Sequence, residues 1–341
     1  MCPTFYVKLG PVKLKKIVND ISGKTSVLDL NKEFDELSGL DSIKNIDNTI
    51  SFVYEKYNRK IDLPKDIYLI ISIHEKDKFS DLNNLIFVDN VHLAVAKLSS
   101  IFYRDINDED FKQNNQHQMA NECFVSNSAV IKKGVTVGKN SIIKDGAVIN
   151  NNCAIGENVL IEENVVISNA IIGDNVRIGR NTSIGQPGFG FAINSFSNHK
   201  IFHLGRVILQ SYVSIGANCC IDRGSFGDTI IGENTFFDNL CHIAHNVEVG
   251  NNCIFAAMSG IAGSSKIGNS VMAGGQVGIS GHLSIGNNVQ IAAKSAVFKS
   301  VRDNCAVMGN PAIDKYAFMR KYKKLYGWWV KTWRNKRTYS P

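Results

Sequence analysis

An apolar residue recurs at every sixth position over a long stretch of this chain. The step holds without a slip at Ile231, Phe237, Ile243, Val249, Phe255, Ile261, Ile267, Ala273, Ile279, Ile285, Ile291 and Val297. A second small or β-branched residue follows four positions after these, as at Thr235, Cys241, Val247, Cys253, Ser259, Ser265, Val271 and Val277. A step of six fits neither the helical repeat nor the simple alternation of a sheet.

Glycine adds a longer period to this pattern. It follows every third apolar position, at Gly232, Gly250, Gly268 and Gly286, which are 18 residues apart. Six-residue units with three units to a coil are the signature of a hexapeptide β-helix. Two inward positions per unit suit a narrow triangular prism with one continuous buried stack. The pattern therefore predicts a mainly β fold of stacked coils.

The repeat begins well before Ile231 and is interrupted twice. It is present at Val125, Ile131, Val137, Ile143, Ile149, Ile155, Ile161 and Ile167, and a one-residue slip then moves it to Ile172, Ile178 and Ile184. Between Gly185 and Val207 it lapses into a glycine- and aromatic-rich segment, called here the excursion (residues 186–206), and a shorter interruption precedes Ile231. Insertions in a solenoid form loops on one face, which is often the binding face.

The remaining sequence divides into three further parts. Residues 1–112 have mixed patterning and predict a small α/β domain, and residues 113–120 are polar and predict a linker. The β-helix is expected over 121–312, and the tail, 313–341, has helix-forming residues with many aromatics.

Within the first domain the pattern predicts particular elements. Helical spacing of apolar residues occurs near Val12 to Ile21 and from His92 to Phe102. Apolar runs at Ile67–Ile71 and Leu85–Val88 predict strands.

Composition describes an ordinary soluble protein. Hydrophobic residues make up 44% of the 341 residues and charged residues 20%. No apolar run is long enough to span a membrane, and the first residues lack a signal-peptide core, so we expect a cytoplasmic location. Of the eight cysteines, five fall on the small inward slot, namely Cys123, Cys153, Cys219, Cys241 and Cys253. This placement and the lack of a C-x-x-C pair predict structural thiols and no metal site.

The positive charge is concentrated in the tail. The chain carries a net charge of +7, and the tail alone holds nine Lys or Arg residues against one acid, Asp314. Such a patch attracts an acidic partner or surface, and we expect no nucleic-acid partner. One interpretation is a helix whose aromatics pack on the last coil or between subunits. The other is an amphipathic helix that docks on a partner or makes peripheral membrane contact.

A candidate catalytic group lies in the strict part of the repeat. His245 follows the inward Ile243 by two positions, which places it on an outer face, where an imidazole titrates near neutral pH and can serve as a general base. Adding 18 residues places Gly263 and Gly281 beside it on the next coils. Two stacked glycines make a bare groove with exposed backbone N–H groups, open to an extended ligand.

A second histidine lies on the neighbouring column of Asn246, Ser264 and His282. With coils stacked at the strand spacing, His245 and His282 should be about 10 Å apart. This separation suits contact with two parts of one substrate. His242 is a weaker candidate for ligand contact, and His199 and His203 in the excursion are weaker still. The alternative for each histidine is a solvated surface residue.

Several motifs occur in an order that resembles one enzyme family. These are Phe189-Gly190-Phe191, Leu204-Gly205-Arg206-Val207, Ile221-Asp222-Arg223-Gly224, Asp238-Asn239, Ile243-Ala244-His245-Asn246, Gly260-Ile261-Ala262-Gly263-Ser264 and Gly281-His282-Leu283. Together they resemble the UDP-3-O-acylglucosamine N-acyltransferases of lipid A biosynthesis. The run from Ile50 through Phe52 to Tyr57, and the Phe87–Asn90 segment before Ala94–Lys97, are similar to the uridine-binding domain of that family.

The resemblance implies a fold and an activity. The fold would be a left-handed parallel β-helix assembled as a homotrimer with active sites between subunits. The enzyme would move a 3-hydroxyacyl chain from acyl carrier protein to the 2-amino group of UDP-3-O-acyl-glucosamine. It would need no cofactor beyond the donor's acyl-phosphopantetheine.

The resemblance also implies roles for particular residues. His245 would be the base, and the backbone N–H of Gly263 would stabilise the oxyanion. Asp238, Asn239, His242, Asn246 and His282 would contact substrate, while Phe52 and Tyr57 would stack on uracil.

Other functions stay open at this point. A related O-acyltransferase acting on UDP-N-acetylglucosamine also uses a β-helix histidine, but its repeats would start near the N-terminus. Another nucleotide-sugar acyl- or acetyltransferase could take coenzyme A as the donor. A non-catalytic scaffold and a carbonic-anhydrase-like metal site are alternatives of a different class, and the metal site needs a convergent histidine set.

Overall fold

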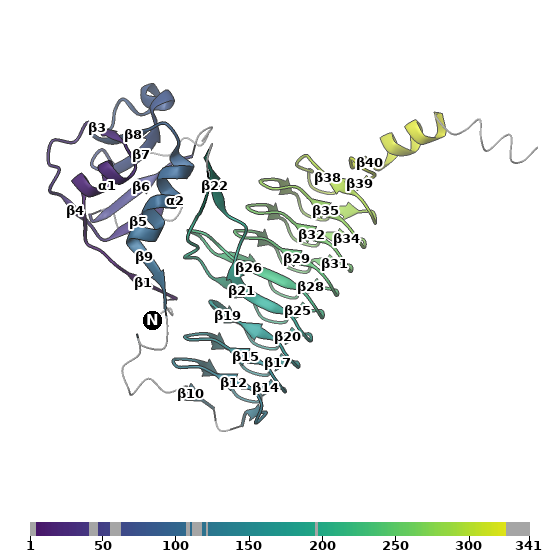
Figure 1. Ribbon diagram of the computed structural model, residues 1–341. Helices are drawn as coiled ribbons and strands as arrows, with labels where there is room; N and C mark the ends of the chain where they lie inside the picture. Colours follow the sequence, from purple (N-terminus) through teal and green to yellow (C-terminus); the bar gives the residue numbers. More distant parts are fainter. Residues whose placement is uncertain are drawn as a thin grey trace, which may run out of the picture.

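The computed structural model describes residues 5–40, 47–54, 63–106, 110, 118–120, 122–194 and 197–324. An α/β domain at the N-terminus lies against one side of a long β-helix, and a helix extends from the far end of the β-helix (Figure 1). The predicted fold class, a mainly β left-handed parallel β-helix with these two additions, is confirmed.

The N-terminal domain is built on a five-stranded sheet. Its strand order is β3 (Lys24–Thr25), β8 (Asn84–Val88), β7 (Tyr68–Ser72), β6 (Thr49–Phe52) and β5 (Glu36–Gly39). Two short ribbons pair β1 (Tyr6–Lys8) with β9 (Tyr103–Asp105) and β2 (Val12–Lys13) with β4 (Glu33–Phe34). The helices are α1 (Leu14–Asp20), α2 (Val91–Phe102) and the 3-10 helix η2 (Ile73–Phe79). The two strands and two helices predicted in this domain are confirmed, with bounds shifted by one or two residues.

The β-helix has three faces, each a parallel sheet. The first sheet contains β11 (Phe124–Val125), β14 (Ile142–Ile143), β17 (Leu160–Ile161), β20 (Arg177–Ile178), β25 (Ser214–Ile215), β28 (Phe236–Phe237), β31 (Ile254–Phe255), β34 (Met272–Ala273), β37 (Gln290–Ile291) and β39 (Ala306–Met308), with β40 (Ile313–Asp314) added antiparallel. The second contains β12 (Val130–Ile131), β15 (Val148–Ile149), β18 (Val166–Ile167), β21 (Ser183–Pro187), β26 (Cys220–Arg223), β29 (His242–Ile243), β32 (Gly260–Ile261), β35 (Gly278–Ile279) and β38 (Ala296–Val297). The third contains β10 (Gln118–Met119), β13 (Thr136–Val137), β16 (Ala154–Ile155), β19 (Ala170–Ile172), β24 (Val207–Leu209), β27 (Thr229–Ile231), β30 (Glu248–Val249), β33 (Lys266–Ile267) and β36 (Ser284–Ile285).

The register explains how the interruptions fit into the stack. In the strict part, Ile243 pairs with Ile261 and Ile261 with Ile279, an offset of 18 residues. The one-residue slip appears where Ala154 pairs with Ile171. Ala170 then pairs directly with Val207, so the coils continue across the excursion as though it were absent. The inserted segments therefore leave the prism intact and project from it.

The inward positions form one buried column, as predicted. The apolar series from Ile231 to Val297 and the small residues from Thr235 to Val277 are all buried. The rings of Phe237 and Phe255 stack inside the prism, with centroids 4.7 Å apart and planes 9° apart. Cys153, Cys219, Cys241 and Cys253 are buried in the same column and are unpaired thiols, whereas Cys123 is half-buried.

The excursion joins the N-terminal domain to the β-helix. It contains a hairpin of β22 (Phe191–Ile193) and β23 (Asn198–Lys200) that lies beside α2 (Figure 1). Ala192, Ile201 and Leu204 are buried in the core of the N-terminal domain. The second, shorter insertion adds Phe226, whose ring packs edge-on against Phe52 at 4.8 Å. The two insertions thus anchor the domain by apolar contact.

Residues 315–324 form a helix after the last coil, and the Asp314 carboxylate accepts a hydrogen bond from Ala317 N at 2.9 Å. The tail aromatics from Tyr326 onward lie outside the described residues. Within the described ranges, no helix is long and apolar enough to cross a membrane.

We predict that Phe255→Ala lowers the free energy of unfolding by about 3–5 kcal/mol, because it leaves a cavity under Phe237 that the prism cannot close. Urea unfolding followed by circular dichroism measures this change. Val166→Ala is the control, since Val166 precedes the buried Ile167 on β18 of the second sheet but is 37% exposed. Equal losses for the two variants would show that the aromatic stack does not stabilise the core.

Candidate active site

His245 lies at the edge where the second sheet turns into the third, between β29 and β30, and its side chain is half-buried. The predicted stacking with the glycines is confirmed by backbone bonds, because Ser264 N donates to His245 O and His282 N donates to Gly263 O. A Cβ placed on Gly263 would lie 2.8 Å from Nε2 and Cε1 of the His245 ring. Glycine at this position therefore leaves the space in which the imidazole lies.

Asn246 fixes the orientation of the imidazole. Its Oδ1 accepts from Ser225 N at 2.9 Å and from Ser225 Oγ at 2.8 Å, and its Nδ2 donates to Gly227 O at 3.0 Å. Because these bonds define which end of the amide is oxygen, Nδ1 of His245, 3.1 Å from Oδ1, must be the protonated nitrogen. Nε2, which faces Gly263, then carries the lone pair that a general base requires.

The amide acquires these partners from the second insertion. Ser225 and Gly227 belong to the loop between β26 and β27, and Thr229 begins β27 and accepts from Asn246 N at 2.9 Å. The family resemblance implied that Asn246 contacts substrate. The structure places it against His245, where its Oδ1 orients the imidazole.

His203, one of the weakest candidates among the histidines of the sequence, lies beside His245. Its ring packs against that of His245, with centroids 5.5 Å apart and planes at 77°. It is buried, and its Nδ1 donates to Ile201 O at 3.0 Å. Burial, with a smaller effect of the nearby His245, lowers the pKa of His203 to about 4. No periodic pattern exists in the excursion, so spacing gave no signal that these two histidines meet.

His242 belongs to a second polar chain on the outer surface of the second sheet. Its Nε2 lies 3.1 Å from Asp222 Oδ2, and Gln186 Nε2 donates to Asp222 Oδ1 at 2.7 Å. The bond to Asp222 raises the pKa of His242, whose side chain is 54% exposed. The raised pKa favours the charged form of this exposed imidazole, which can contact an anionic group.

A strip without side chains runs along the second sheet next to His242. His242 pairs with Gly260, Gly260 with Gly278 and Gly278 with Ala296. A Cβ on Gly260 or Gly278 would meet nothing within 4 Å. The strip is therefore open, and an extended ligand could lie along it within reach of His242.

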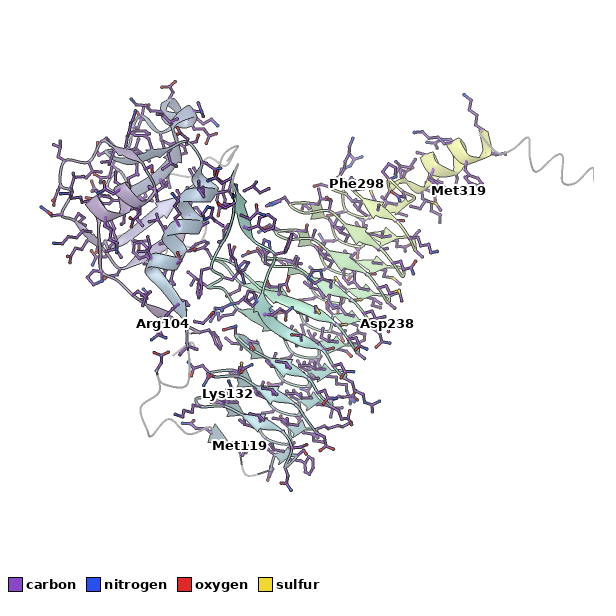
Figure 2. The ribbon with its side chains drawn as sticks, viewed as in Figure 1. Arg104, Met119, Lys132, Asp238, Phe298 and Met319 are labelled. Carbon is purple, nitrogen blue, oxygen red and sulfur yellow. The ribbon has the colours of Figure 1, made fainter. Side chains whose placement is uncertain are left out.

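Other predicted site residues lie apart from His245 in this chain. Asp238 and Asn239 are exposed at the edge between the first and second sheets, and Figure 2 shows Asp238 on the side away from the N-terminal domain. The Asn239 Oδ1 accepts from Ala217 N at 2.7 Å. His282 is exposed two coils beyond Asn246 on the His245 edge, as the spacing predicted.

The aromatic residues expected to bind uracil are covered or outside the structure. Phe52 is 4% exposed and packs against Tyr54 and Phe226, and Tyr57 lies outside the described residues. Tyr54 instead stacks on the His92 ring, with centroids 3.9 Å apart and planes 8° apart.

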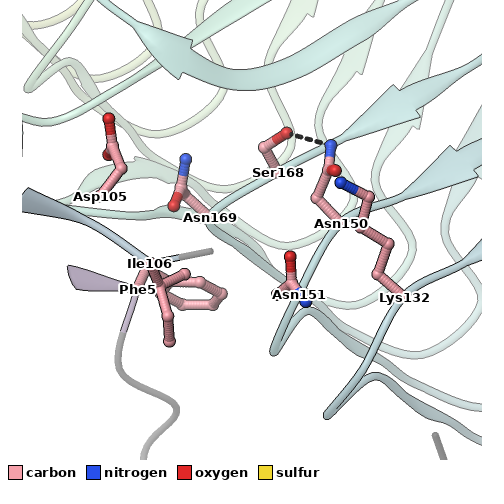
Figure 3. A pocket seen from close by; sticks show the side chains of 8 residues that line it. All are labelled: Phe5, Asp105, Ile106, Lys132, Asn150, Asn151, Ser168 and Asn169. Atoms are coloured by element: carbon pink, nitrogen blue, oxygen red, sulfur yellow. Dashed lines mark hydrogen bonds between the residues drawn. The ribbon is translucent and has the colours of Figure 1, made fainter. Parts of the chain in front are cut away.

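A separate polar cavity of about 360 Å³ lies between the N-terminal domain and the earlier coils (Figure 3). It is lined by Phe5, Asp105, Ile106, Lys132, Asn150, Asn151, Ser168 and Asn169. Asn150 Nδ2 donates to Ser168 Oγ at 2.7 Å across its wall. Among the described residues, no group of three or more His, Cys, Asp or Glu side chains is placed to hold a metal ion.

The fold and the edge histidine define a hexapeptide-repeat β-helix protein. The bacterial transferase hexapeptide family model (six repeats) matches residues 152–186 and 228–263. The chain is 53% identical over 64 residues to the UDP-3-O-acylglucosamine N-acyltransferase of Caulobacter vibrioides, and 52% identical over the same length to that of Maricaulis maris. Each match covers 19% of this chain and 19% of the relative, so the chain is matched to about a fifth of the length of these relatives. The resemblance stated from the motifs is thus confirmed.

A solved structure shares the fold over a longer range. The UDP-N-acetylglucosamine acyltransferase of Campylobacter jejuni is 26% identical with a TM-score of 0.50, covering 59% of this chain and 83% of that one.

The buried His203 predicts acid sensitivity. Its pKa of about 4 is below that of an unfolded histidine, about 6.5, so the unfolded chain binds more protons between these values and stability falls as the pH drops. The charged and titratable groups around it are His245, Arg223 and Asp222. We expect wild type to lose about 2 kcal/mol more than His203→Phe between pH 7 and pH 5. Urea unfolding at both pH values measures this difference, and equal losses would contradict it.

Proposed function

We propose that the protein is an N-acyltransferase that moves a 3-hydroxyacyl chain from acyl carrier protein to the 2-amino group of UDP-3-O-acyl-glucosamine. One observation carries the proposal. Asn246 holds the proton on Nδ1 of His245, which leaves Nε2 free beside Gly263. The relatives that are similar over 64 residues are named for this activity, which supports the choice of acceptor.

The geometry suits aminolysis of a thioester. As the substrate amine attacks the thioester carbon, a C–N bond forms and Nε2 of His245 accepts the amine proton. Collapse of the tetrahedral intermediate breaks the C–S bond, and the proton passes from the imidazole to the departing thiolate. Within the described part of the chain, no backbone acceptor takes the Gly263 N–H, so this group can donate to the oxyanion.

Substrate groups would then be distributed over the surface around this centre. His242, held by Asp222, and His282, exposed on the same edge as His245, would contact anionic parts such as phosphate. The bare strip of Gly260 and Gly278 would take an extended chain. Uracil would bind at the N-terminal domain, where stacking on Phe52 requires Phe226 or Tyr54 to move off its ring.

Asp238 and Asn239 can join such a site only from another subunit, because they lie at a different edge of the prism. The outward row of the first sheet supports assembly, since Phe236, Ile254 and Met272 are exposed there together. We therefore propose a homotrimer whose sites lie between subunits. The basic tail, of which residues 315–324 are helical, would attract the acidic acyl carrier protein.

A second candidate is O-acylation of UDP-N-acetylglucosamine, favoured by the match to the Campylobacter jejuni structure. One experiment distinguishes the two. Purified protein is incubated with acyl carrier protein thioesters or acyl-coenzyme A and with either UDP-3-O-acyl-glucosamine or UDP-N-acetylglucosamine, and products are identified by mass spectrometry. Transfer to the amine alone supports the proposal, and an O-acyl product on UDP-N-acetylglucosamine supports the alternative.

We predict that His245→Ala lowers the rate of the chemical step by about a hundredfold or more, the range for a lost general base. Single-turnover acyl transfer measures this rate. His199→Ala is the control, because His199 lies in the excursion, where its Nε2 is hydrogen-bonded to Ser197 Oγ at 2.9 Å. If His245→Ala turns over at a near-normal rate with an intact fold, another group is the base.

Gly263→Ala should also reduce kcat severely, because its methyl group would lie 2.8 Å from the His245 ring and displace it. Gly275→Ala is the matched control on a neighbouring coil, where the nearest atom, Ala257 O, would be 3.4 Å away. Acyl-transfer kinetics with thermal unfolding measures both. Normal turnover by Gly263→Ala would mean that the ring does not need this space.

A further inference from the structure

His203 contacts His245 from the excursion and has no role in the chemistry described above. Two glycines make room for the pair of rings. A Cβ on Gly188 would lie 2.7 Å from His245 Cβ and 3.1 Å from His203 Nε2, and a Cβ on Gly190 would lie 2.8 Å from His203 Cε1. The chain around Gly188 thus packs closely on both imidazoles at once. This contact leaves the His203 ring little freedom to move away.

The backbone on both sides of His203 is fixed by hydrogen bonds. Phe202 N donates to Ser99 Oγ on α2 at 3.1 Å. On the other side, Arg223 donates to Leu204 O through Nη2 at 3.0 Å and to Gly205 O through Nε at 2.7 Å. Arg223 is fully buried, and its Nη1 lies 3.5 Å from the Asp105 carboxylate, at the end of β9. Both domains therefore hold this short segment.

The side chains of the segment divide between the two domains. Ile201 and Leu204 are buried in the core of the N-terminal domain, whereas the intervening His203 packs on His245 of the β-helix. The position of the His203 ring consequently depends on the position of the N-terminal domain relative to the β-helix.

The chemistry of His203 suits a fixed packing residue rather than a group that carries protons. Its Nδ1 donates to Ile201 O, and its buried Nε2 has no hydrogen-bond partner among the residues that the structure describes. Burial keeps its pKa at about 4, so the ring is neutral near pH 7. A neutral, desolvated ring inclined at 77° to that of His245 restricts the rotation of that imidazole and excludes water from one side of it.

We propose that His203 is a positioning residue. The position of the N-terminal domain relative to the β-helix sets the position of the His203 ring, and this ring in turn sets the orientation of His245. This inference rests on the proposed function in so far as His245 is the base. The contact itself is independent of the reaction, and one readout below needs no substrate.

The test compares His203→Ala, His203→Phe and His199→Ala. We expect kcat to fall about tenfold to a hundredfold in His203→Ala, because small displacements of a catalytic group have effects of this size. KM for the UDP-sugar should stay within about twofold, because a misoriented base weakens the transition state and leaves ground-state binding of the substrate unchanged. His203→Phe should recover most of kcat by restoring the ring, and His199→Ala should match wild type.

A second variant tests the proposal even if His203→Ala fails to fold. Gly190→Ala keeps His203 but pushes on its ring, and it should lower kcat in the same way. The substrate-free readout is the rate at which diethyl pyrocarbonate modifies His245, followed by peptide mass spectrometry. We expect faster modification in His203→Ala and Gly190→Ala than in wild type, and a wild-type rate in His199→Ala.

The outcomes separate the two proposals. Wild-type kcat and wild-type modification of His245 in both His203→Ala and Gly190→Ala would overturn the positioning role. A rise in KM with unchanged kcat in both variants would also overturn the positioning role, since it would show that His203 affects only the binding of substrate. If His245→Ala retains turnover, the proposed function fails, while faster modification of His245 in His203→Ala would still establish the contact.

Discussion

Backbone hydrogen bonding between successive coils is the constraint on which the rest of this structure depends. Each coil donates to the next, as in Ala244 N to Ile261 O and Ala262 N to Ile279 O, so equivalent positions lie one above another. The inward residues then form one dry column. The outward residues form straight rows, and one edge brings His245 and Gly263 together. An error of one residue in the register would separate them, which is why the insertions loop out between paired strands.

The regular part of the molecule could be predicted because its pattern repeats. The six-residue step identified the inward residues. The 18-residue step placed Gly263 beside His245, and it placed His282 on the same edge of the prism. Sequence spacing could not place residues that depend on the insertions. The contact between His203 and His245, and the bonds from Asn246 to Ser225 and Gly227, join segments without periodicity. The ring of Phe52 is likewise covered by Phe226, which is distant from it in the sequence.

The insertions give the edge its chemistry. A bare hexapeptide prism would present His245 on a solvated surface with both ring nitrogens free to protonate. The second insertion supplies the partners that hold Asn246, and through it the tautomer of His245. The excursion adds the neutral ring of His203. Because Ile201 and Leu204 on either side of it are buried in the N-terminal domain, the ring is connected to that domain. The N-terminal domain is therefore in physical contact with His245, through a segment fixed by the buried Arg223.

We propose that Nε2 of His245, whose other ring nitrogen keeps its proton through the contact with Asn246, receives the proton of the substrate amine. A crystal structure of the protein with UDP-3-O-acyl-glucosamine bound tests it most directly. We expect the 2-amino nitrogen within hydrogen-bonding reach of Nε2, about 3 Å, and the Asn246 Oδ1 contact to Nδ1 preserved. An amine bound away from His245, or an imidazole turned so that Nδ1 faces the substrate, would contradict it.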